Sequence, residues 1–382
     1  MKLKDKIKEL GPVKTPFYYY DTDILNRTLD MILQESDKYG FHVHYAIKAN
    51  ANSQILKIIA EAGFGADCVS GNEIKAAIQN GFTPDKIAFA GVGKSDEEIL
   101  IGLNKGIFSF NIESLEELKV INKLAEEQKK KASIAVRINP NVDPQTHKYI
   151  TTGIEETKFG VHMWDLEEVI DFISRSEFLL LKGLHFHIGS QISRLAPFKA
   201  LCAKINEIQD WFNLRNIYPE HINVGGGLGI DYNDPDKLPD FEAYFSLFND
   251  LLILRKEQKV HFELGRAVVG QAGSLISRVL YVKKGVNTDF LILDAGMTDF
   301  MRPALYQAYH LIENLSSNAS GKVKYNIVGP VCESTDSFGR YRELPESSRG
   351  DLIAIRSAGA YGMVMASQYN LRDLPGEITG SR

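Results

Sequence analysis

From Val43 to Arg266, short apolar runs with the period of a β-strand alternate with segments whose apolar residues have the spacing of an amphipathic helix. We identify eight candidate strands, and consecutive βα units of this number predict a closed parallel (β/α)8 barrel of the TIM type, with its active site at the carboxyl ends of the strands. An open doubly wound sheet is the alternative, since a strand count from one sequence can be off by one or two. The candidate strands are Val43–Lys48, Gly65–Val69, Lys86–Gly91, Ile107–Asn111, Ser133–Asn139, Gly183–Gly189, His221–Gly227 and Val260–Arg266.

The pattern of predicted elements changes after Gly273, where strand-like runs follow one another without long helices. We therefore predict an α/β protein in which residues 24–272 form the barrel, and residues 1–23 together with 273–382 form a second, mostly β domain. Within the barrel, the capping boxes Ser95–Glu98 and Ser114–Glu117 mark two helix starts. The strand-like runs of the second domain are Ser274–Lys283, Phe290–Asp294, Lys324–Val328 and Asp351–Ser357.

Charge and cysteine content narrow the class of function. The 382 residues carry a net charge of -5 with acids and bases interspersed, which favours neither nucleic acid nor a membrane as partner and makes a small molecule the expected substrate. The three cysteines, Cys68, Cys202 and Cys332, are odd in number and far apart, so we expect reduced thiols and a cytoplasmic protein. The sequence shows neither an apolar run long enough to span a bilayer nor the apolar core of a signal peptide.

One lysine, Lys48, stands at the carboxyl end of the first strand-like run. An amine in that position points into the expected site, where desolvation lets it lose its proton and attack an aldehyde. This is the chemistry of a Schiff-base lysine that holds pyridoxal phosphate. For an isolated lysine, a side chain that extends into solvent is the commoner interpretation, so the motifs further along the chain decide between the two.

Two histidines at the end of the sixth strand, His185 and His187, share one face of it because side chains alternate along a strand. One of these rings could lie flat against a cofactor ring. Zinc binding is the alternative interpretation, but no nearby Cys or His spacing completes a ligand set. We therefore expect no metal site.

The last two strands end in groups that suit a phosphorylated ring. The seventh runs into Gly225–Gly227, where backbone amides can approach a phosphate, although a plain turn has the same composition. The eighth carries Glu263 and Arg266 with Gly265 between them. A buried carboxylate there could keep a pyridine nitrogen protonated and strengthen the ring as an electron sink. An internal salt bridge between Glu263 and Arg266 is the alternative.

The β-rich domain adds two candidates. Cys332 follows a strand and lies close to Glu333 and Asp336, a polar setting that favours chemistry over the inert position usual for a free cysteine. Tyr361 stands between small residues and could present its phenol to a phosphate or pack as an ordinary tyrosine.

Taken in order, these segments resemble the fold-type III pyridoxal-phosphate-dependent decarboxylases, and among them most closely the diaminopimelate decarboxylases. The resemblance covers nearly the whole chain. Two positions depart from the family pattern, since Asn72 stands where glycine is common and Leu264 replaces the usual proline; both departures concern local backbone geometry. The matching motifs are Tyr45–Asn50, Val69–Gly71, Gly91–Lys94, Asn139–Asp143, Lys158–Gly160, His187–Ser190, Gly225–Gly227, Cys332–Ser334 and Gly359–Tyr361.

The resemblance implies how pyridoxal 5'-phosphate would be bound. Lys48 would hold the cofactor as a Schiff base, His187 would stack on the pyridine ring, and Glu263 would pair with the ring nitrogen. Arg266 could serve either the phosphate or the substrate. The phosphate would be held by Ser190, Gly227, Gly265 and Tyr361.

The resemblance also implies the substrate and the assembly. Meso-2,6-diaminopimelate would be decarboxylated to L-lysine, the last step of lysine biosynthesis. Cys332 would return a proton to the substrate from the partner subunit of a homodimer with shared active sites. The distal carboxylate would be held by Arg266, Arg302 and Tyr306, with Tyr361 as a further substrate contact and Glu333 on the distal amine.

Three other functions share parts of this machinery. A decarboxylase of ornithine, lysine or arginine needs the same cofactor but no clamp for a second carboxylate, so the pair Arg266 and Arg302 favours a dicarboxylate substrate. A racemase of the alanine racemase type shares barrel and cofactor, but Glu263 suits a stronger electron sink than a racemase needs. A noncatalytic homologue would be expected to lack the proton donor or the clamp, and this chain has candidates for both.

Overall fold

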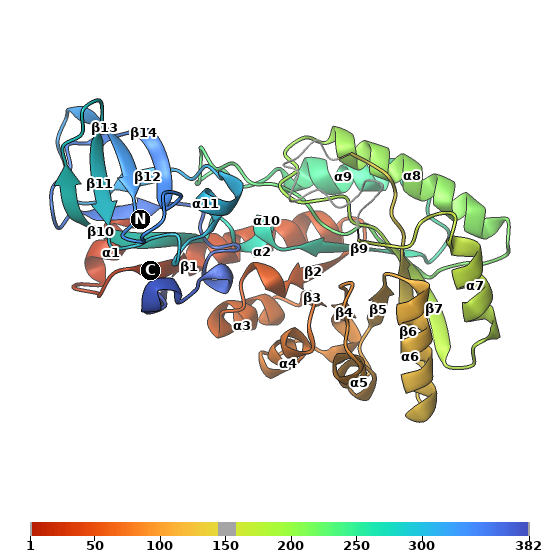
Figure 1. Ribbon diagram of the computed structural model, residues 1–382. Helices are drawn as coiled ribbons and strands as arrows, with labels where there is room; N and C mark the ends of the chain where they lie inside the picture. Colours follow the sequence, from red (N-terminus) through yellow and green to blue (C-terminus); the bar gives the residue numbers. More distant parts are fainter. Residues whose placement is uncertain (1, 144–157, 381–382) are drawn as a thin grey trace. The chain divides into compact units, whose positions relative to one another are not determined.

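The computed structural model describes residues 2–143 and 158–380, which form two compact units (Figure 1). The described parts of Leu29–Gly229 and Pro239–Gly265 form the first, which we call the barrel unit. Those of Met1–Thr28, Ile230–Leu238 and Arg266–Arg382 form the second, which we call the β unit.

The barrel unit contains eight parallel strands that close on themselves, with the first strand paired to the last. This confirms the predicted TIM-type barrel and excludes the open doubly wound sheet, because a closed barrel has no edge strand. Each predicted run overlaps one of these strands, although several strands begin or end one to four residues outside it. The strands are β2(His42–Ala46), β3(Gly65–Cys68), β4(Ile87–Phe89), β5(Ser109–Ile112), β6(Ala132–Arg137), β7(Leu179–His185), β8(His221–Asn223) and β9(Lys259–Leu264).

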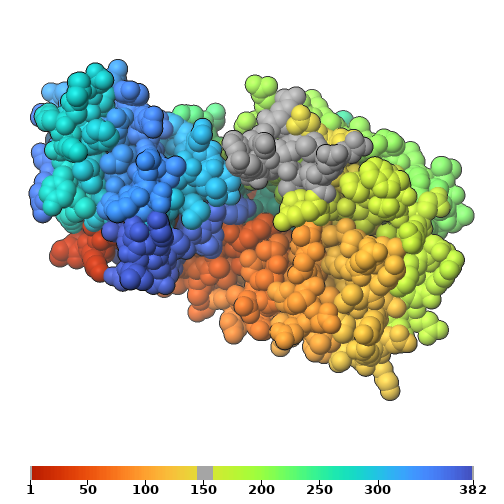
Figure 2. Space-filling model, in the orientation of Figure 1, coloured from red at the N-terminus to blue at the C-terminus, as the bar shows by residue number. Residues whose placement is uncertain are grey.

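Helices follow the strands and cover the outside of the barrel. Three neighbouring ones, α4(Gly71–Gln79), α5(Asp96–Lys105) and α6(Leu115–Glu127), lie side by side, and their side chains form a continuous orange to yellow surface in Figure 2. No helix in the described part of the chain combines the length and the apolar character that a membrane crossing requires. The others are α2(Thr22–Asp37), which leads into the barrel unit, η1(Ile47–Ala49), α3(Ser53–Glu61), η2(Pro84–Lys86), α7(Leu166–Arg175), α8(Ala196–Asn213) and α9(Phe241–Leu251).

Small polar residues start several of these helices. The side chains of Asn52 and Ser70 accept hydrogen bonds from the first turns of α3 and α4, which satisfies N–H groups that a helix leaves open. The capping box predicted at Ser95 is complete. The one predicted at Ser114 is only half formed. The Ser114 side chain accepts from the Glu117 N–H, but the Glu117 side chain accepts from the Glu113 N–H and forms an ion pair with Lys94 instead of binding the Ser114 N–H.

The apolar core of the barrel unit lies between the strands and the helices. Phe262 of β9 packs against Phe41 and against three rings of α9, Tyr244, Phe245 and Phe248, with ring centroids 4.9 to 5.7 Å apart. All five rings are buried. Removing these rings from water stabilises the contact between α9 and the barrel.

The β unit is built on an eight-stranded sheet, which confirms the predicted second, mostly β domain. Its long strand β10(Gly273–Lys283) pairs with β1(Phe17–Asp21), β11(Asp289–Leu293) and β15(Leu352–Ile355). The remaining strands are β12(Ile312–Asn314), β13(Lys322–Val328), β14(Ser337–Pro345) and β16(Gly376–Gly380), and the helices are α1(Leu3–Glu9), α10(Arg266–Val269), α11(Arg302–Tyr306), η4(Met363–Met365) and η5(Tyr369–Leu371).

The four runs predicted for this domain correspond to β10, β11, β13 and β15. The sequence analysis did not identify β1, β12, β14 or β16. β1 is buried along its whole length and so lacks an alternating pattern, while β12 has only three residues and β16 has no fully buried residue. Strands of these kinds give little periodic signal.

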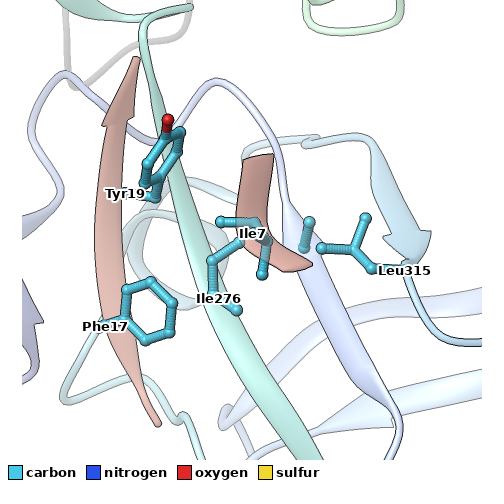
Figure 3. Packing of buried hydrophobic residues seen from close by; sticks show 6 residues of the cluster. Ile7, Phe17, Tyr19, Ile276 and Leu315 are labelled. Carbon is cyan, nitrogen blue, oxygen red and sulfur yellow. The ribbon is translucent and has the colours of Figure 1, made fainter. Parts of the chain in front are cut away.

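Helix α1 is held to this sheet by a hydrophobic cluster and a buried ion pair. Ile7 packs with Phe17 and Ile276, close to Tyr19 and Leu315 (Figure 3). Next to Ile7 in the sequence, the buried Lys6 forms an ion pair with the last residue of β1, Asp21. Its Nζ atom lies 2.8 Å from Asp21 Oδ2. Apolar burial stabilises the helix in place, and the ion pair orients it.

Three histidines form a hydrogen-bonded row at the amino end of the barrel. His44 Nδ1 lies 3.1 Å from the carbonyl oxygen of Lys86, and because a carbonyl only accepts, this nitrogen carries a hydrogen. His44 Nε2 then accepts from His261 Nδ1 at 2.9 Å, and His261 Nε2 accepts from His221 Nδ1 at 3.1 Å. The whole row is satisfied when all three rings are neutral.

The surroundings of the row favour the neutral rings. Burial lowers the pKa of His44 to about 4. It also lowers the pKa of His221 to about 4, where Glu220 opposes the shift and Lys259 adds to it. Burial, helped by the neighbouring imidazoles, lowers the pKa of His261 well below its ordinary value.

We predict that the barrel unit loses stability as the pH falls from about 6.5, the pKa of an unfolded histidine, to the folded pKa of about 4. The pKa is lower in the folded state, so the unfolded chain binds more protons in this window. The contribution is therefore complete above about pH 6.5, and His44 alone accounts for a loss of about 2 kcal/mol at about pH 5.

Urea unfolding at about pH 7 and pH 5 measures this loss, because both tryptophans, Trp164 and Trp211, lie in the barrel unit and report on it by fluorescence. His44→Gln removes one titrating ring and should reduce the pH dependence by about 2 kcal/mol. An equally steep dependence in the variant would contradict this account.

Candidate active site

Lys48 lies in the turn η1, just past the carboxyl end of β2. The strand predicted to reach Lys48 ends at Ala46, because the Tyr45 hydroxyl donates to the carbonyl oxygen of Asn50 at 2.8 Å and the chain turns there. The Lys48 amine donates to Asp67 Oδ2 at 2.7 Å. The candidate nucleophile is thus held at the barrel end by an ion pair.

Asp67, in β3, is fully buried and was not identified from the sequence. Burial is the main cause that raises the pKa of Asp67 to about 6; Glu263 adds to the shift, and Lys48 opposes it. Near neutral pH the Asp67 carboxylate is therefore charged, and at 2.7 Å it holds the Lys48 side chain and is close enough to exchange a proton with it. The available signal was an acid inside the otherwise apolar run Gly65–Cys68.

The Glu263 carboxylate is buried inside the barrel and accepts three hydrogen bonds. Oε2 accepts from His185 Nε2 at 2.9 Å, and Oε1 accepts from the side-chain amides of Asn223 at 2.8 Å and Asn111 at 3.3 Å. Burial by itself raises the pKa of Glu263, but the interactions with His185 and Lys48 outweigh burial and leave the pKa far below its ordinary value. Glu263 is therefore ionised, and these partners take the place of the internal salt bridge that the sequence allowed.

His187 lies just beyond β7, at the carboxyl end of the barrel. Its Nδ1 accepts from the Gly226 N–H at 3.3 Å, so the neutral ring carries its hydrogen on Nε2. Burial lowers the pKa of His187 well below its ordinary value, and Arg137 and Lys48 lower it further. A neutral, half-buried imidazole of this kind can lie against a flat ring.

The two predicted histidines therefore have different partners, since His185 binds Glu263 and His187 binds the glycine loop. Within residues 2–143 and 158–380, no three His, Cys, Asp or Glu side chains are grouped so that they could hold a metal ion. The zinc interpretation of His185 and His187 gains no support from their positions.

Glycines at the carboxyl ends of β8 and β9 pack too closely for side chains. A Cβ atom at Gly226 would lie 1.8 Å from the carbonyl oxygen of Glu263, and one at Gly227, where φ is +102°, would lie 2.5 Å from the carbonyl oxygen of Gly189. The loop that contains Ser190 is tied to Gly227 by a backbone hydrogen bond of 2.8 Å from Ile192. Only backbone groups are available here, which suits contact with a phosphate.

Gly265, at the end of β9, packs against the turn that carries Lys48. A Cβ atom at Gly265 would lie 3.0 Å from the Cβ of Ala49 and 3.1 Å from that of Ala46. Three predicted residues of the barrel unit, Lys48, Glu263 and Gly265, thus belong to two neighbouring strands and their ends.

A second charged pair lies at the same end of the barrel and was also missed. Arg137, the last residue of β6, has its Nη1 atom 2.6 Å from Glu113 Oε1. Glu113 also accepts the N–H groups of Gly91 at 3.2 Å and Gly160 at 2.8 Å, so one carboxylate joins motifs that are far apart in the sequence. The signal would have been an arginine at the end of an apolar strand-like run.

In the β unit, two arginines and three tyrosines form one group, which we call the arginine–tyrosine cluster. The Tyr232 hydroxyl accepts from Arg266 Nη1 at 2.7 Å and from Arg302 Nη2 at 3.3 Å. The Arg266 guanidinium lies 4.9 Å from the centre of the Tyr361 ring, and that of Arg302 lies 5.7 Å from the Tyr306 ring. Four of the five residues were predicted from separate motifs, while nothing in the sequence singled out Tyr232.

Cys332 is an exposed free thiol in the β unit. Its N–H donates to Asn370 Oδ1 at 3.4 Å, and the neighbouring Glu333 accepts from the Tyr369 hydroxyl at 2.7 Å. The other acid predicted near the thiol, Asp336, is buried and accepts backbone N–H groups. Asp336 therefore holds the loop together, whereas Cys332 and Glu333 lie on its surface.

Comparison with known proteins shows to which family the chain belongs. Residues 25–270 match the family model described as pyridoxal-dependent decarboxylase, pyridoxal binding domain. The chain is 58% identical to a diaminopimelate decarboxylase of Bacteroides thetaiotaomicron, covering 97% of this chain and 96% of the relative. It is 39% identical to that of Aquifex aeolicus, covering 97% and 88%.

Solved structures give the same result. The diaminopimelate decarboxylase of Helicobacter pylori, complexed with L-lysine, is 39% identical with a TM-score of 0.93, and the match covers 98% of this chain and 94% of that one. A lysine decarboxylase of Selenomonas ruminantium, at 21% identity and a TM-score of 0.86, shares the fold. Because it matches the family model and is 58% and 39% identical, over 97% of its length, to two diaminopimelate decarboxylases, the chain belongs to the pyridoxal-dependent decarboxylases and, within them, to the diaminopimelate decarboxylase family.

Proposed function

We propose that this chain decarboxylates meso-2,6-diaminopimelate to L-lysine and carbon dioxide, the last step of lysine biosynthesis, with pyridoxal 5'-phosphate as cofactor. The observation that carries this proposal is the 58% identity to a diaminopimelate decarboxylase over 97% of the chain. The Helicobacter pylori relative was solved with L-lysine, which is the product of the proposed reaction.

The carboxyl end of the barrel fits pyridoxal phosphate. Lys48 offers an amine for the aldehyde, and the ionised Glu263 offers a partner for a protonated ring nitrogen. The glycine loop leaves no room for a side chain at Gly226 or Gly227, so a phosphate can approach its backbone closely. When bound, pyridoxal phosphate supplies an electron-poor ring that takes up the electron pair left on the substrate carbon as carbon dioxide departs.

The residues of the barrel unit would divide the work on the cofactor. Lys48 would bind the aldehyde carbon through Nζ, and Asp67, 2.7 Å from Nζ, would orient the amine and exchange a proton with it. His187 would lie against the ring, and Glu263 would keep the ring nitrogen protonated. Ser190, Gly227 and Gly265, joined by Tyr361, would hold the phosphate.

The arginine–tyrosine cluster would hold the far end of the substrate. Arg266, Arg302 and Tyr306 would bind the distal carboxylate, because two guanidiniums in a buried cluster suit an anion with two oxygens. Tyr361 would be a further substrate contact, and Glu333 would bind the distal amine. In this assignment Arg266 serves the substrate.

We further propose a homodimer with shared active sites. Cys332 would deliver a proton to the substrate carbon that loses its carboxylate, and it would do so in the partner's site. Its exposure on the surface of the β unit supports this assignment, since it is accessible to another subunit. Residues 24–272 would then bind the cofactor, while residues 1–23 and 273–382 would contribute to the active site and the dimer interface.

A cytoplasmic location is consistent with the thiols. All three cysteines are unpaired. Free thiols persist where glutathione and thioredoxin keep proteins reduced.

The decarboxylases of ornithine, lysine or arginine are the remaining alternative. Structures of a lysine decarboxylase and of a lysine/ornithine decarboxylase match at 21% and 18% identity, which establishes a common fold and nothing about the substrate. No observation favours this alternative over a dicarboxylate substrate.

The proposed function predicts substrate selectivity. Purified protein with pyridoxal phosphate should release carbon dioxide faster from meso-2,6-diaminopimelate than from ornithine, lysine or arginine, each supplied separately. The reason is that only the first of these offers a distal carboxylate to the arginine pair. Faster release from one of the other three would replace the proposed substrate.

Arg302→Ala should lower kcat/KM for meso-2,6-diaminopimelate by at least about tenfold, because a charge-assisted hydrogen bond contributes roughly 1.5–3 kcal/mol. Cofactor binding, followed by its absorbance, should change little. Arg349→Ala is a matched control, since Arg349 is also in the β unit but exposed. If Arg302→Ala abolished cofactor binding while activity per bound cofactor stayed the same, Arg302 would belong to the cofactor site instead.

A shared site predicts complementation between inactive chains. Lys48→Ala and Cys332→Ala homodimers should each be inactive, but mixing them should regain part of the activity. Some hybrid dimers then have one site with both residues intact. Subunit exchange is checked by mass spectrometry of tagged chains, and no regain despite exchange would count against Cys332 acting in the partner's site.

A further inference from the structure

Tyr232 joins the two arginines of the arginine–tyrosine cluster through a single oxygen atom. Its hydroxyl oxygen accepts from Arg266 at 2.7 Å and from Arg302 at 3.3 Å. With the oxygen occupied as an acceptor on both sides, its own hydrogen points away from the guanidiniums. Within residues 2–143 and 158–380, no group accepts that hydrogen, so it is available to a ligand.

The cluster concentrates positive charge in a buried environment. Both guanidiniums belong to side chains that are only 5% exposed. Burial lowers the pKa of Arg302, and the charge of Arg266 lowers it further. In the described part of the chain no carboxylate forms an ion pair with Arg302, and buried charges are normally paired, so the Arg302 guanidinium favours an anion.

The position of the Tyr232 ring is fixed by its neighbours. The ring packs edge-on against His310 with centroids 4.6 Å apart, and His310 Nδ1 donates to the carbonyl oxygen of Arg356 at 2.9 Å. On the other side, the Asp231 side chain accepts the N–H of Asn233 at 2.8 Å and closes a turn. The hydroxyl is therefore held in place by the contact with His310 and by the turn at Asp231, in addition to its bonds to the guanidiniums.

We propose that Tyr232 determines specificity for the distal carboxylate of the substrate. Its oxygen holds two like-charged guanidiniums around one point, and its O–H donates to the carboxylate that they bind. Without this oxygen the guanidiniums lose their shared acceptor and repel each other, so the carboxylate loses one donor and the alignment of two others. This inference rests on the proposed function, because it needs a substrate with a distal carboxylate.

Tyr232→Phe tests the proposal, since it removes one oxygen atom and keeps the ring against His310. We expect KM for meso-2,6-diaminopimelate to rise about tenfold and kcat to change by less than about threefold. Cofactor absorbance and the thermal midpoint should match those of the unaltered protein. Tyr281→Phe is the matched control, because Tyr281 is exposed in β10 of the same unit, and its kcat and KM should not change.

A double-mutant cycle with Arg302→Ala separates a direct role from a general one. Both residues act on one carboxylate, so Tyr232→Phe should have little further effect once Arg302 is alanine. An unchanged KM in Tyr232→Phe, or a tenfold effect in both backgrounds, would overturn the proposal. Loss of cofactor or a lowered thermal midpoint in Tyr232→Phe would assign the residue a structural role and would also overturn it.

Failure of the proposed function looks different. In that case the unaltered protein would release no carbon dioxide from meso-2,6-diaminopimelate, whatever residue stands at position 232. The inference about Tyr232 would then fall together with the function on which it rests.

Discussion

One buried carboxylate, that of Glu263, organises the interior of the barrel. A charge inside a protein is tolerated only where hydrogen bonds or opposite charges surround it. Three strands meet this requirement for Glu263, since its partners His185, Asn223 and Asn111 come from β7, β8 and β5. Only a closed barrel brings these strands around one point, so barrel closure and the ionised state of Glu263 support each other.

Strands β2 and β9 each carry polar groups at different depths of the barrel. In β2, the buried neutral His44 precedes Lys48, which lies just beyond the carboxyl end; in β9, His261 likewise precedes Glu263. Alternate residues of a strand point the same way, so each strand contributes to more than one layer. Neutral histidines therefore support the barrel below the charged groups that would bind the cofactor.

The candidate binding groups of the two units differ in charge. This difference matches the two tasks of the proposed reaction, which are to bind the cofactor and to bind the substrate. The barrel unit holds carboxylates and an amine, which suit the ring nitrogen and the aldehyde of the cofactor. The arginine–tyrosine cluster is positively charged, which suits a substrate carboxylate. One of the changes of unit along the chain falls between Gly265 and Arg266, so these neighbouring residues belong to different units.

Hydrophobic periodicity by itself determined that the chain contains the strands of a (β/α)8 barrel, because each βα unit buries its apolar face locally. It also placed Lys48, His187 and Glu263 at or near strand ends, where parallel strands present functional groups. It could not indicate which residues Asp67 and Tyr232 bind, because their partners are distant in sequence; Tyr232 and Arg302 are 70 residues apart. Tertiary structure alone decided which side chains meet, since distances between strands and loops depend on register and closure and not on local pattern.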